Sequence, residues 1–304
     1  MKRNSLVNGA DLVIAVGALG QNPKPQVDFR ERTQANGFLQ ISGSVAGASR
    51  PLWRERRAPA RGQDARATAG ETPAVPGKLR CQEVVTPSAY DSPHFIAVEG
   101  PIRVGKTTLA NILAERLRAV RVYDAEDNPF LEAFYKDKPG AAFQAQFHFL
   151  IKRYRQLRDL DLAANPNRVV VSDYIFEKDK IFAYLNLNDI ELQVYDQFYG
   201  MLAEQVPIPD LVIYLQAKLE TLKKRIAKKN VAFEDRISNE YLEAVVHAYE
   251  HFFFHYKSSD LLVIDTSEID FVDRSEHLQE LLRRLSQPVK GTQYFLPLGS
   301  APAD

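Results

Sequence analysis

Residues 94–117 constrain the possible folds of this chain more than any other part of its sequence. An apolar run from Phe95 to Val98 leads into Gly-Pro-Ile-Arg-Val-Gly-Lys-Thr at residues 100–107, and apolar residues at helical spacing follow. The pattern G-x-x-x-x-G-K-T between a strand and a helix is typical of a loop that wraps backbone N–H groups around a polyphosphate. The N-terminus of the following helix adds partial positive charge. The segment therefore predicts a nucleoside triphosphate site in an α/β framework.

Two side chains of this loop are expected to act on the triphosphate directly. Lys106 would reach the β- and γ-phosphates, and the hydroxyl of Thr107 would bind Mg²⁺. The full set of residues predicted to line the phosphate site is Gly100, Pro101, Ile102, Arg103, Val104, Gly105, Lys106, Thr107 and Thr108.

Charge and cysteine content exclude several classes of protein. Lysine and arginine together number 39, as do aspartate and glutamate, so the formal net charge is zero. This balance argues against nucleic acid as a partner, because such binding depends on a basic surface. The single cysteine, Cys81, excludes an internal disulfide framework and a cysteine-rich zinc site, and it fits a reducing compartment. No apolar run is long enough to span a bilayer, so we expect a cytoplasmic protein with no membrane partner.

The composition changes sharply near residue 90. Residues 45–90 are rich in Ala, Arg, Gly, Pro and Ser without helical or strand periodicity, so residues 1–92 are predicted to form a disordered extension. A transit peptide would share the Arg and Ala content, but acids such as Asp28, Glu31 and Glu55 argue against it. We expect a catalytic domain at residues 93–288 and a C-terminal tail at residues 289–304.

From residue 94 onward, strand-like and helix-like segments alternate. The predicted strands, each a short and nearly continuous apolar run, are 94–99, 120–124, 168–172, 210–215 and 260–264. The predicted helices are 106–119, 129–137, 141–163, 177–206, 218–229 and 237–257. This alternation predicts a three-layer α/β fold with a parallel five-stranded sheet and helices on both faces. Ligands of such sheets bind at the carboxyl ends of the strands.

Acidic residues follow two of these predicted strands. Asp124 and Glu126 come after the second strand, where a carboxylate beside a triphosphate is a candidate general base for an attacking hydroxyl. The neighbouring Asp127 and Asn128 precede a proline and are interpreted as helix caps. Asp173 ends the third strand, a usual position for binding Mg²⁺ through water. Asp173 is therefore a candidate catalytic residue and a candidate metal partner of Thr107.

Two further patterns admit more than one interpretation. The basic end of the helix at 218–229 contains Arg225, Lys228 and Lys229, which either complement the helix dipole or belong to a lid over the phosphates. The histidines His247, His251 and His255 recur every four residues, but the aromatic residues between them favour packing over metal binding.

The helix predicted at 141–163 has Gln146 and Arg153 two turns apart on one edge of its apolar face. An amide and a guanidinium beside a pocket are suited to reading the edge of a nucleobase. Taken alone, the pair is better explained as two solvated polar residues on a helix surface.

Together these segments resemble the deoxynucleoside kinase family, and particularly its bacterial deoxyadenosine/deoxyguanosine kinase branch. The resemblance covers residues 94 to about 272. Its motifs are GPIRVGKTTLA at 100–110, DNPFLEAFYKDKPGAAFQAQFHFLIKRYRQL at 127–157, SDYIFEKDKIFA at 172–183 and RIAKKNVAFEDRISNEYLE at 225–243. The resemblance implies a P-loop kinase fold with a basic lid.

The resemblance also implies a role for each residue that matches a family position. Tyr135 and Glu234 would hold the sugar 3′-hydroxyl, and Gln146 would read the base. Arg153 and Asp179 would form the ion pair at the base edge, which suits a purine. On this basis Gln146 and Arg153 are expected to be site residues and not solvated ones.

Four departures from the family pattern are visible. Arg103 stands where the family has a second glycine in its phosphate loop. After the third strand, Tyr174 occupies the position of a catalytic arginine, so charge neutralisation must rely on the lid. The lid itself lacks the family's R-x-R pattern. No residue matches the family's catalytic glutamate cleanly. Asp124 lies closest to the expected position at the end of the second strand, and Glu126 is next.

The resemblance implies transfer of the γ-phosphoryl group of ATP, with Mg²⁺, to the 5′-hydroxyl of a purine deoxynucleoside, and it implies a homodimer. A thymidylate-type monophosphate kinase would need basic residues where this chain has carboxylates. A regulatory P-loop NTPase would show N-K-x-D and D-x-x-G motifs, and the sequence contains neither at the expected places.

Overall fold

The computed structural model describes residues 93–295 except 125–126, 137, 163, 166, 230–236, 268, 270 and 272–274. The predictions for residues 1–92, for Glu126 and for Glu234 lie outside the described residues. The same holds for the side chain of Tyr135, for which only the backbone is described.

The described part of the chain is built on a six-stranded sheet in the order β2-β3-β1-β4-β5-β6. Each neighbouring pair of strands is parallel. The strands are β1 Phe95–Glu99, β2 Val120–Val122, β3 Val170–Ser172, β4 Leu211–Gln216, β5 Asp260–Asp265 and β6 Thr292–Phe295. The β1 strand is buried at every residue, as a strand covered on both faces should be.

The prediction of five strands was wrong by one. The strand β6 lies within residues 289–304, which were predicted to be a tail, and it pairs with β5. Its sequence, TQYF, buries only Phe295, because an edge strand contacts the core at few positions. Such a short and mainly polar segment lacks the apolar run by which the other strands are recognised.

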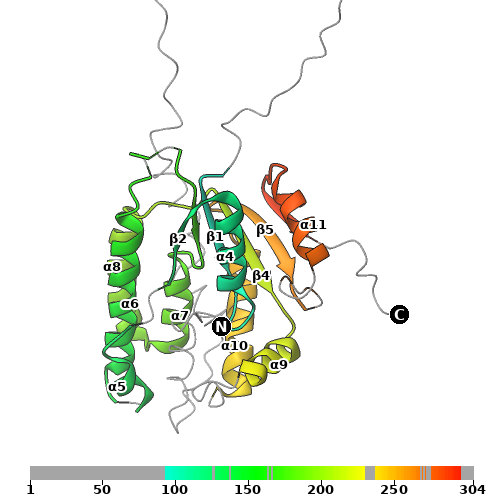
Figure 1. The fold of residues 1–304 in the computed structure, drawn as a ribbon. Helices are drawn as coiled ribbons and strands as arrows, with labels where there is room; N and C mark the ends of the chain where they lie inside the picture. Colours follow the sequence, from blue (N-terminus) through cyan, green and yellow to red (C-terminus); the bar gives the residue numbers. More distant parts are fainter. Residues whose placement is uncertain are drawn as a thin grey trace, which may run out of the picture.

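Helices cover both faces of the sheet, as predicted for a three-layer fold (Figure 1). They are α4 Lys106–Leu117, α5 Leu131–Tyr135, α6 Ala141–Arg158, α7 Lys178–Asn186, α8 Asp189–Ala203, α9 Leu219–Lys229, α10 Asn239–Phe254 and α11 Ser275–Leu285. Alternate residues of β1 enter two separate cores. Phe95 and Ala97 pack with α6, α7, α8 and α10, whereas Ile96 and Val98 pack with α4, α9 and α11.

The single helix predicted at 177–206 is two helices, α7 and α8. The break falls at Leu187 and Asn188, where the Asn188 side chain accepts hydrogen bonds from the N–H groups of Ile190 and Glu191. The Glu191 carboxylate in turn accepts the N–H of Asn188 at 3.1 Å. This capping box starts a new helix, and it places the two helices side by side to enclose the polar cluster described below.

The strand order decides where the functional residues meet. Because β2, β3 and β1 are neighbours and parallel, their carboxyl ends lie at one edge of the sheet. The phosphate loop follows β1, Asp124 follows β2, and Asp173 follows β3. These three segments therefore share one site.

Candidate active site

The phosphate loop depends on two glycines with positive φ angles. At Gly100, with φ of 152°, an added Cβ would lie 2.2 Å from the carbonyl oxygen of Leu215, so no larger residue fits. Gly105, with φ of 113°, turns the backbone into α4. The Lys106 ammonium donates hydrogen bonds to the carbonyl oxygens of Gly100 (2.8 Å) and Pro101 (3.1 Å). The lysine is thus held inside the loop that was predicted to bind phosphate.

Arg103 has a left-handed backbone conformation. Its φ angle is 60°, in the left-handed region that non-glycine residues rarely enter. This conformation costs roughly 1–2 kcal/mol for a residue with a Cβ. The loop therefore has a left-handed turn at this position despite the energetic cost for an arginine.

Glu99 is a buried site residue that the sequence analysis missed. Its carboxylate accepts the N–H of Gly100 at 2.8 Å, the N–H of Ile175 at 3.0 Å and the hydroxyl of Tyr249 at 3.2 Å. It thereby ties the start of the phosphate loop to the segment after β3 and to α10. A carboxylate at the last position of an otherwise apolar strand, directly before the loop, is the signal that could have identified it.

The side chains of Asp173 and Thr107 lie in contact. The Thr107 hydroxyl donates to one Asp173 oxygen at 2.7 Å, and the N–H of Asp124 donates to the other at 2.8 Å. Burial raises the pKa of Asp173, although the bond from Thr107 opposes this. A hydroxyl and a carboxylate supply the oxygen ligands that Mg²⁺ prefers.

A metal held by protein side chains alone has no support among the described residues, which contain no group of three or more His, Cys, Asp or Glu suited to one. The rings of His251 and His255 pack against each other with centroids 4.7 Å apart. The interpretation of the histidine run as packing is consistent with this contact.

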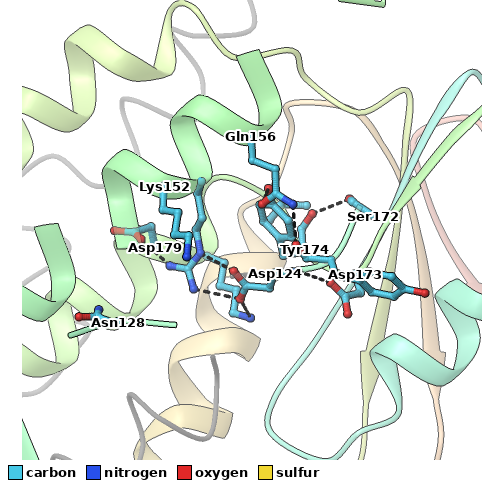
Figure 2. A network of polar contacts seen from close by, with 12 residues as sticks. Asp124, Asn128, Lys152, Gln156, Ser172, Asp173, Tyr174 and Asp179 are labelled. Carbon is cyan, nitrogen blue, oxygen red and sulfur yellow. Dashed lines mark hydrogen bonds and ion pairs between the residues drawn. The ribbon is translucent and has the colours of Figure 1, made fainter. Parts of the chain in front are cut away.

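Asp124 lies at the centre of a buried network of ion pairs (Figure 2). Its two oxygens accept hydrogen bonds from Nε and Nη2 of Arg153, at 2.8 and 3.0 Å. The ammonium of Lys178 also donates to it, at 2.7 Å. Arg153 extends its remaining nitrogen, Nη1, to Asp179. Positive and negative charges thus alternate as Lys178, Asp124, Arg153 and Asp179, and all four side chains are fully buried.

The two carboxylates of this network differ in their proton affinity. Burial acts to raise the pKa of Asp124, but the charges of Arg153 and Lys178 outweigh it and hold the pKa well below its usual range. Burial raises the pKa of Asp179, which has a single cationic neighbour. Asp124 is therefore a weak proton acceptor for as long as both cations stay bound to it.

The base-side residues implied by the resemblance form one buried cluster. The amide nitrogen of Gln146 donates to the Asp179 carboxylate at 2.8 Å and to its backbone carbonyl at 2.9 Å. The hydroxyl of Tyr195, on α8, donates to the same carboxylate at 2.7 Å. The structure thus brings Gln146, Arg153 and Asp179 together, and neither α6 residue is solvated. Tyr195 was missed, because its position in a helical run of buried aromatics indicates only packing.

Tyr174, at the sequence position of the family arginine, and Lys178 are both buried and have polar contacts. Tyr174 is fully buried, and its hydroxyl donates to Gln156 of α6 at 2.9 Å. Lys178 follows four residues later and brings its charge to Asp124. The sequence analysis did not single out Lys178, since one lysine in a charged segment is usually solvated.

The residues proposed for the lid are found at two different places. Arg225 donates to the carbonyl oxygen of Val104 at 3.1 Å and to that of Thr266 at 2.6 Å, so it fixes the phosphate loop to the end of β5. Lys228 and Lys229 are exposed at the end of α9. The segment that follows them, 230–236, lies outside the described residues.

The two residues interpreted as caps also have defined contacts. The side chain of Asn128 accepts the N–H of Phe130 at 3.0 Å and donates to the carbonyl oxygen of Ala145 at 2.8 Å, which joins the start of α5 to α6. Asp127 forms an exposed ion pair with Lys152. The interpretation of both residues as helix caps was wrong, because the N-cap residue of α5 is Phe130, which makes no side-chain cap hydrogen bond.

No helix among the described residues has the length and apolar character needed to cross a bilayer.

Comparison with solved structures finds relatives of the same fold. A structure of deoxyadenosine kinase from M. mycoides with the products dCMP and a flexible dCDP bound is 26% identical, with a TM-score of 0.55. That match covers 63% of this chain and 98% of the other. A second structure of this enzyme, with bound dATP, is 25% identical with a TM-score of 0.54, over 64% of this chain and 100% of the other.

Comparison of sequences gives the same assignment. Deoxyguanosine kinase from Bacillus subtilis (strain 168) is 36% identical over 201 residues, which are 62% of this chain and 97% of the relative. Deoxyadenosine kinase from Lactobacillus acidophilus is 29% identical over 210 residues, 64% of this chain and 96% of the relative. The model of the family described as deoxynucleoside kinase matches residues 96–290, more than half of the chain. The chain therefore belongs to the deoxynucleoside kinase family, as its sequence motifs predicted.

Proposed function

We propose that this enzyme transfers the γ-phosphoryl group of ATP to the 5′-hydroxyl of a purine deoxynucleoside, in nucleotide salvage. The observation that carries the substrate class is the buried cluster of Gln146, Arg153 and Asp179. An amide that offers both a donor and an acceptor, next to an Asp–Arg pair, complements the mixed donor and acceptor edge of a purine. Relatives named deoxyguanosine kinase and deoxyadenosine kinase support this assignment.

The phosphate side of the site supplies positive charge and oxygen ligands. Lys106 would turn from the loop carbonyls to the β- and γ-phosphates of ATP, where it neutralises charge that develops during transfer. Mg²⁺ would bind Thr107 directly and Asp173 through water. Bound Mg²⁺ would neutralise phosphate charge and orient the triphosphate for in-line transfer.

The general base is proposed to be Asp124 or Glu126. Asp124 lies next to Asp173 and the phosphate loop, which favours it by position. Its low pKa means that it accepts a proton only after one of its two cationic partners moves away. Phosphoryl transfer tolerates a weak base, because its transition state is loose and little charge develops on the attacking oxygen.

The sugar and the lid are assigned by the family pattern. Tyr135 and Glu234 are proposed to hold the 3′-hydroxyl of the deoxyribose. Lys228 and Lys229 are proposed to close over the phosphates. Arg225 holds the phosphate loop in place through its hydrogen bond to the carbonyl oxygen of Val104. Closure would exclude water, which strengthens every electrostatic interaction in the site.

We further propose a cytoplasmic homodimer. Four large apolar side chains at helical spacing are exposed on α8, namely Ile190, Val194, Phe198 and Met201. An exposed apolar stripe of this kind usually marks an interface. Sedimentation of the protein as a monomer at micromolar concentration would contradict this part of the proposal.

The test of the proposed function is a substrate panel. The purified protein is incubated with ATP, Mg²⁺ and each of the four deoxynucleosides, and the products are separated by chromatography. We expect 5′-monophosphate from deoxyadenosine or deoxyguanosine at the highest rate. ATP hydrolysis without any deoxynucleoside monophosphate would overturn the proposal. A parallel reaction with dTMP tests the monophosphate kinase alternative, for which we expect no product.

A further inference from the structure

The segments after β2 and β3 carry Asp124 and Asp173, and the pairing of the two strands stops just before these residues. The strands pair up to Val122 and Ser172, and the N–H of Asp173 then donates to the carbonyl oxygen of Val122 at 3.1 Å. Beyond this point the N–H of Asp124 donates to the side chain of Asp173 at 2.8 Å, in place of a backbone carbonyl. The positions of the two carboxylates therefore depend on contacts outside the sheet.

Gln156 of α6 contacts both of these segments (Figure 2). Its Nε2 donates to the carbonyl oxygen of Tyr123, the residue directly before Asp124, at 2.7 Å. Its Oε1 accepts the hydroxyl of Tyr174, the residue directly after Asp173, at 2.9 Å. A backbone carbonyl can only accept a hydrogen bond, so the orientation of the amide is fixed by its partners. These two hydrogen bonds form the Gln156 bridge.

Tyr123 is also bound from the opposite layer of the fold. Its hydroxyl donates to Oδ1 of Asn111 at 2.5 Å. Asn111 belongs to α4, the helix that begins at the phosphate loop, and α4 and α6 pack in different cores. The residue before Asp124 is thus held between the phosphate-loop helix and α6. Loss of the Gln156 bridge would leave it attached to α4 but free to shift relative to α6.

Gln156 continues the polar stripe of α6 that reaches the base-side cluster. Gln146, Arg153 and Gln156 follow one another at spacings of seven and three residues, which places them on one face of the helix. Gln146 and Gln156 lie roughly 15 Å apart along the helix axis, from ten residues at the helical rise. One helix therefore extends from the residues proposed to read the base to the backbone beside Asp124.

We propose that Gln156 is a positioning residue for phosphoryl transfer. The Gln156 bridge holds Asp124 and Asp173 at a fixed place relative to the base-reading residues on the same helix. The inference rests on the proposed function, in which these two carboxylates act at the transfer site. Its two partners, Tyr123 and Tyr174, are assigned to neither the base nor the phosphates, so its loss changes kcat and leaves substrate binding intact. A displacement of about 1 Å is enough for a large loss of rate.

The central experiment compares Gln156→Leu with Gln144→Leu. The first variant removes both bonds of the Gln156 bridge, and the second makes the same chemical change at an exposed position of the same helix. The measurements are kcat and KM for ATP and for the best deoxynucleoside of the substrate panel, and calorimetric titration with ATP counts the folded binding sites. We expect Gln156→Leu to lower kcat per binding site by about tenfold or more, while both KM values change by less than about twofold. Gln144→Leu should leave all of these values unchanged.

Tyr174→Phe tests the Gln156 bridge with a milder change, because it removes one hydroxyl and keeps the buried ring. Its matched control is Tyr184→Phe, which removes the hydroxyl of another buried tyrosine, bound to Asp196 at 3.0 Å. We expect kcat to fall by about fivefold for Tyr174→Phe and to stay unchanged for Tyr184→Phe. The double variant of Gln156→Leu and Tyr174→Phe should lose no more kcat than Gln156→Leu alone, because both changes break the same bridge. Tyr174→Phe decides the question if Gln156→Leu fails to fold, as judged by circular dichroism.

Several outcomes would overturn the positioning role. One is an unchanged kcat per binding site in the folded variants of Gln156 and Tyr174. Another is an effect on the KM of the deoxynucleoside alone, which would place Gln156 in the base site. A third is an equal fall of kcat in Tyr174→Phe and Tyr184→Phe, which would trace the loss to looser packing in general. A wild-type protein that phosphorylates no deoxynucleoside would instead refute the proposed function itself, so the two failures are distinguishable.

Discussion

The phosphate loop and the base-side cluster are built on different physical principles. The loop is local: residues 100–107 follow one another in the sequence, and backbone angles at Gly100 and Gly105 give it its shape. The cluster is assembled from α6, α7 and α8, whose residues meet only after the helices pack. Its charged members are fully buried and pair with one another. The loop therefore depends on the backbone conformation of its glycines, whereas the cluster depends on the charges of its side chains.

The largest expected effect tests the ion network. Asp124→Asn leaves Arg153 and Lys178 buried without their shared counter-charge, which typically costs about 3–5 kcal/mol of folding free energy. Urea unfolding at pH 7 measures this loss. The matched control is Asp127→Asn, which removes an exposed ion pair with Lys152 and should cost less than about 1 kcal/mol. Equal costs for the two variants would refute the contrast between network and surface.

The stability difference between the wild type and Asp124→Asn is also expected to depend on pH. Because the pKa of Asp124 is lowered in the folded state, its stabilising contribution is present above its unfolded pKa of about 3.9 and is lost as pH falls toward the folded value. The stability difference between the wild type and Asp124→Asn should therefore shrink as pH is lowered below about 4. Asp173 and Asp179, whose pKa values are raised by burial, contribute in the opposite direction. A difference that stays constant from pH 7 to pH 3 would contradict the assignment.

The next prediction concerns chemistry in the loop. Lys106→Ala removes the cation held by the carbonyls of Gly100 and Pro101. We expect kcat to fall by roughly 10²–10³, the usual loss when a donor to the transition state is removed. Lys290→Ala, at an exposed position, is the control and should retain wild-type turnover. A fall of less than tenfold would show that Lys106 keeps its place in the loop during catalysis.

A smaller effect tests the backbone of the loop. Gly100→Ala places a Cβ 2.2 Å from the carbonyl oxygen of Leu215, and we expect a loss of about 3 kcal/mol in unfolding free energy. Gly200→Ala, in α8, has open space around it and should stabilise the helix by about 0.5–1 kcal/mol. If Gly100→Ala proves neutral, the close approach of loop and β4 does not limit this position.

The smallest expected effect concerns Arg103. Arg103→Gly relieves a left-handed conformation but adds freedom to the unfolded chain, so we expect a net gain below about 1 kcal/mol. Turnover gives the more informative result. A decrease in kcat would support a role for Arg103 in place of the arginine absent at Tyr174, and unchanged turnover would rule that role out.

Much of the framework could be predicted from the sequence, and the misses have identifiable causes. Five strands were recognised because continuous apolar runs mark strands buried on both faces. The strand β6 was missed because an edge strand needs few apolar residues. The break between α7 and α8 was missed because the apolar period continues across it, while the capping box of Asn188 and Glu191 is a subtle polar signal.

The site residues also divide into those that the sequence could predict and those that it could not. The phosphate loop could be predicted residue by residue, since its motif is contiguous. Gln146 and Arg153 became candidates only through the family resemblance, because spacing alone does not distinguish a buried polar pair from a solvated one. Glu99, Lys178 and Tyr195 were not predicted, and each acquires its role from partners far away in the sequence.

The sequence by itself determined the phosphate loop, the alternation of strands and helices, and the family. Those features depend on local conformation and on periodicity, which neighbouring residues encode. Only the tertiary structure decided that Asp124 is paired with two cations and that Arg153 joins it to Asp179. The physical reason is that the charge state of a carboxylate depends on burial and on charges within a few ångströms. Those charges come from separate helices, and the sequence alone does not reveal that these helices pack together.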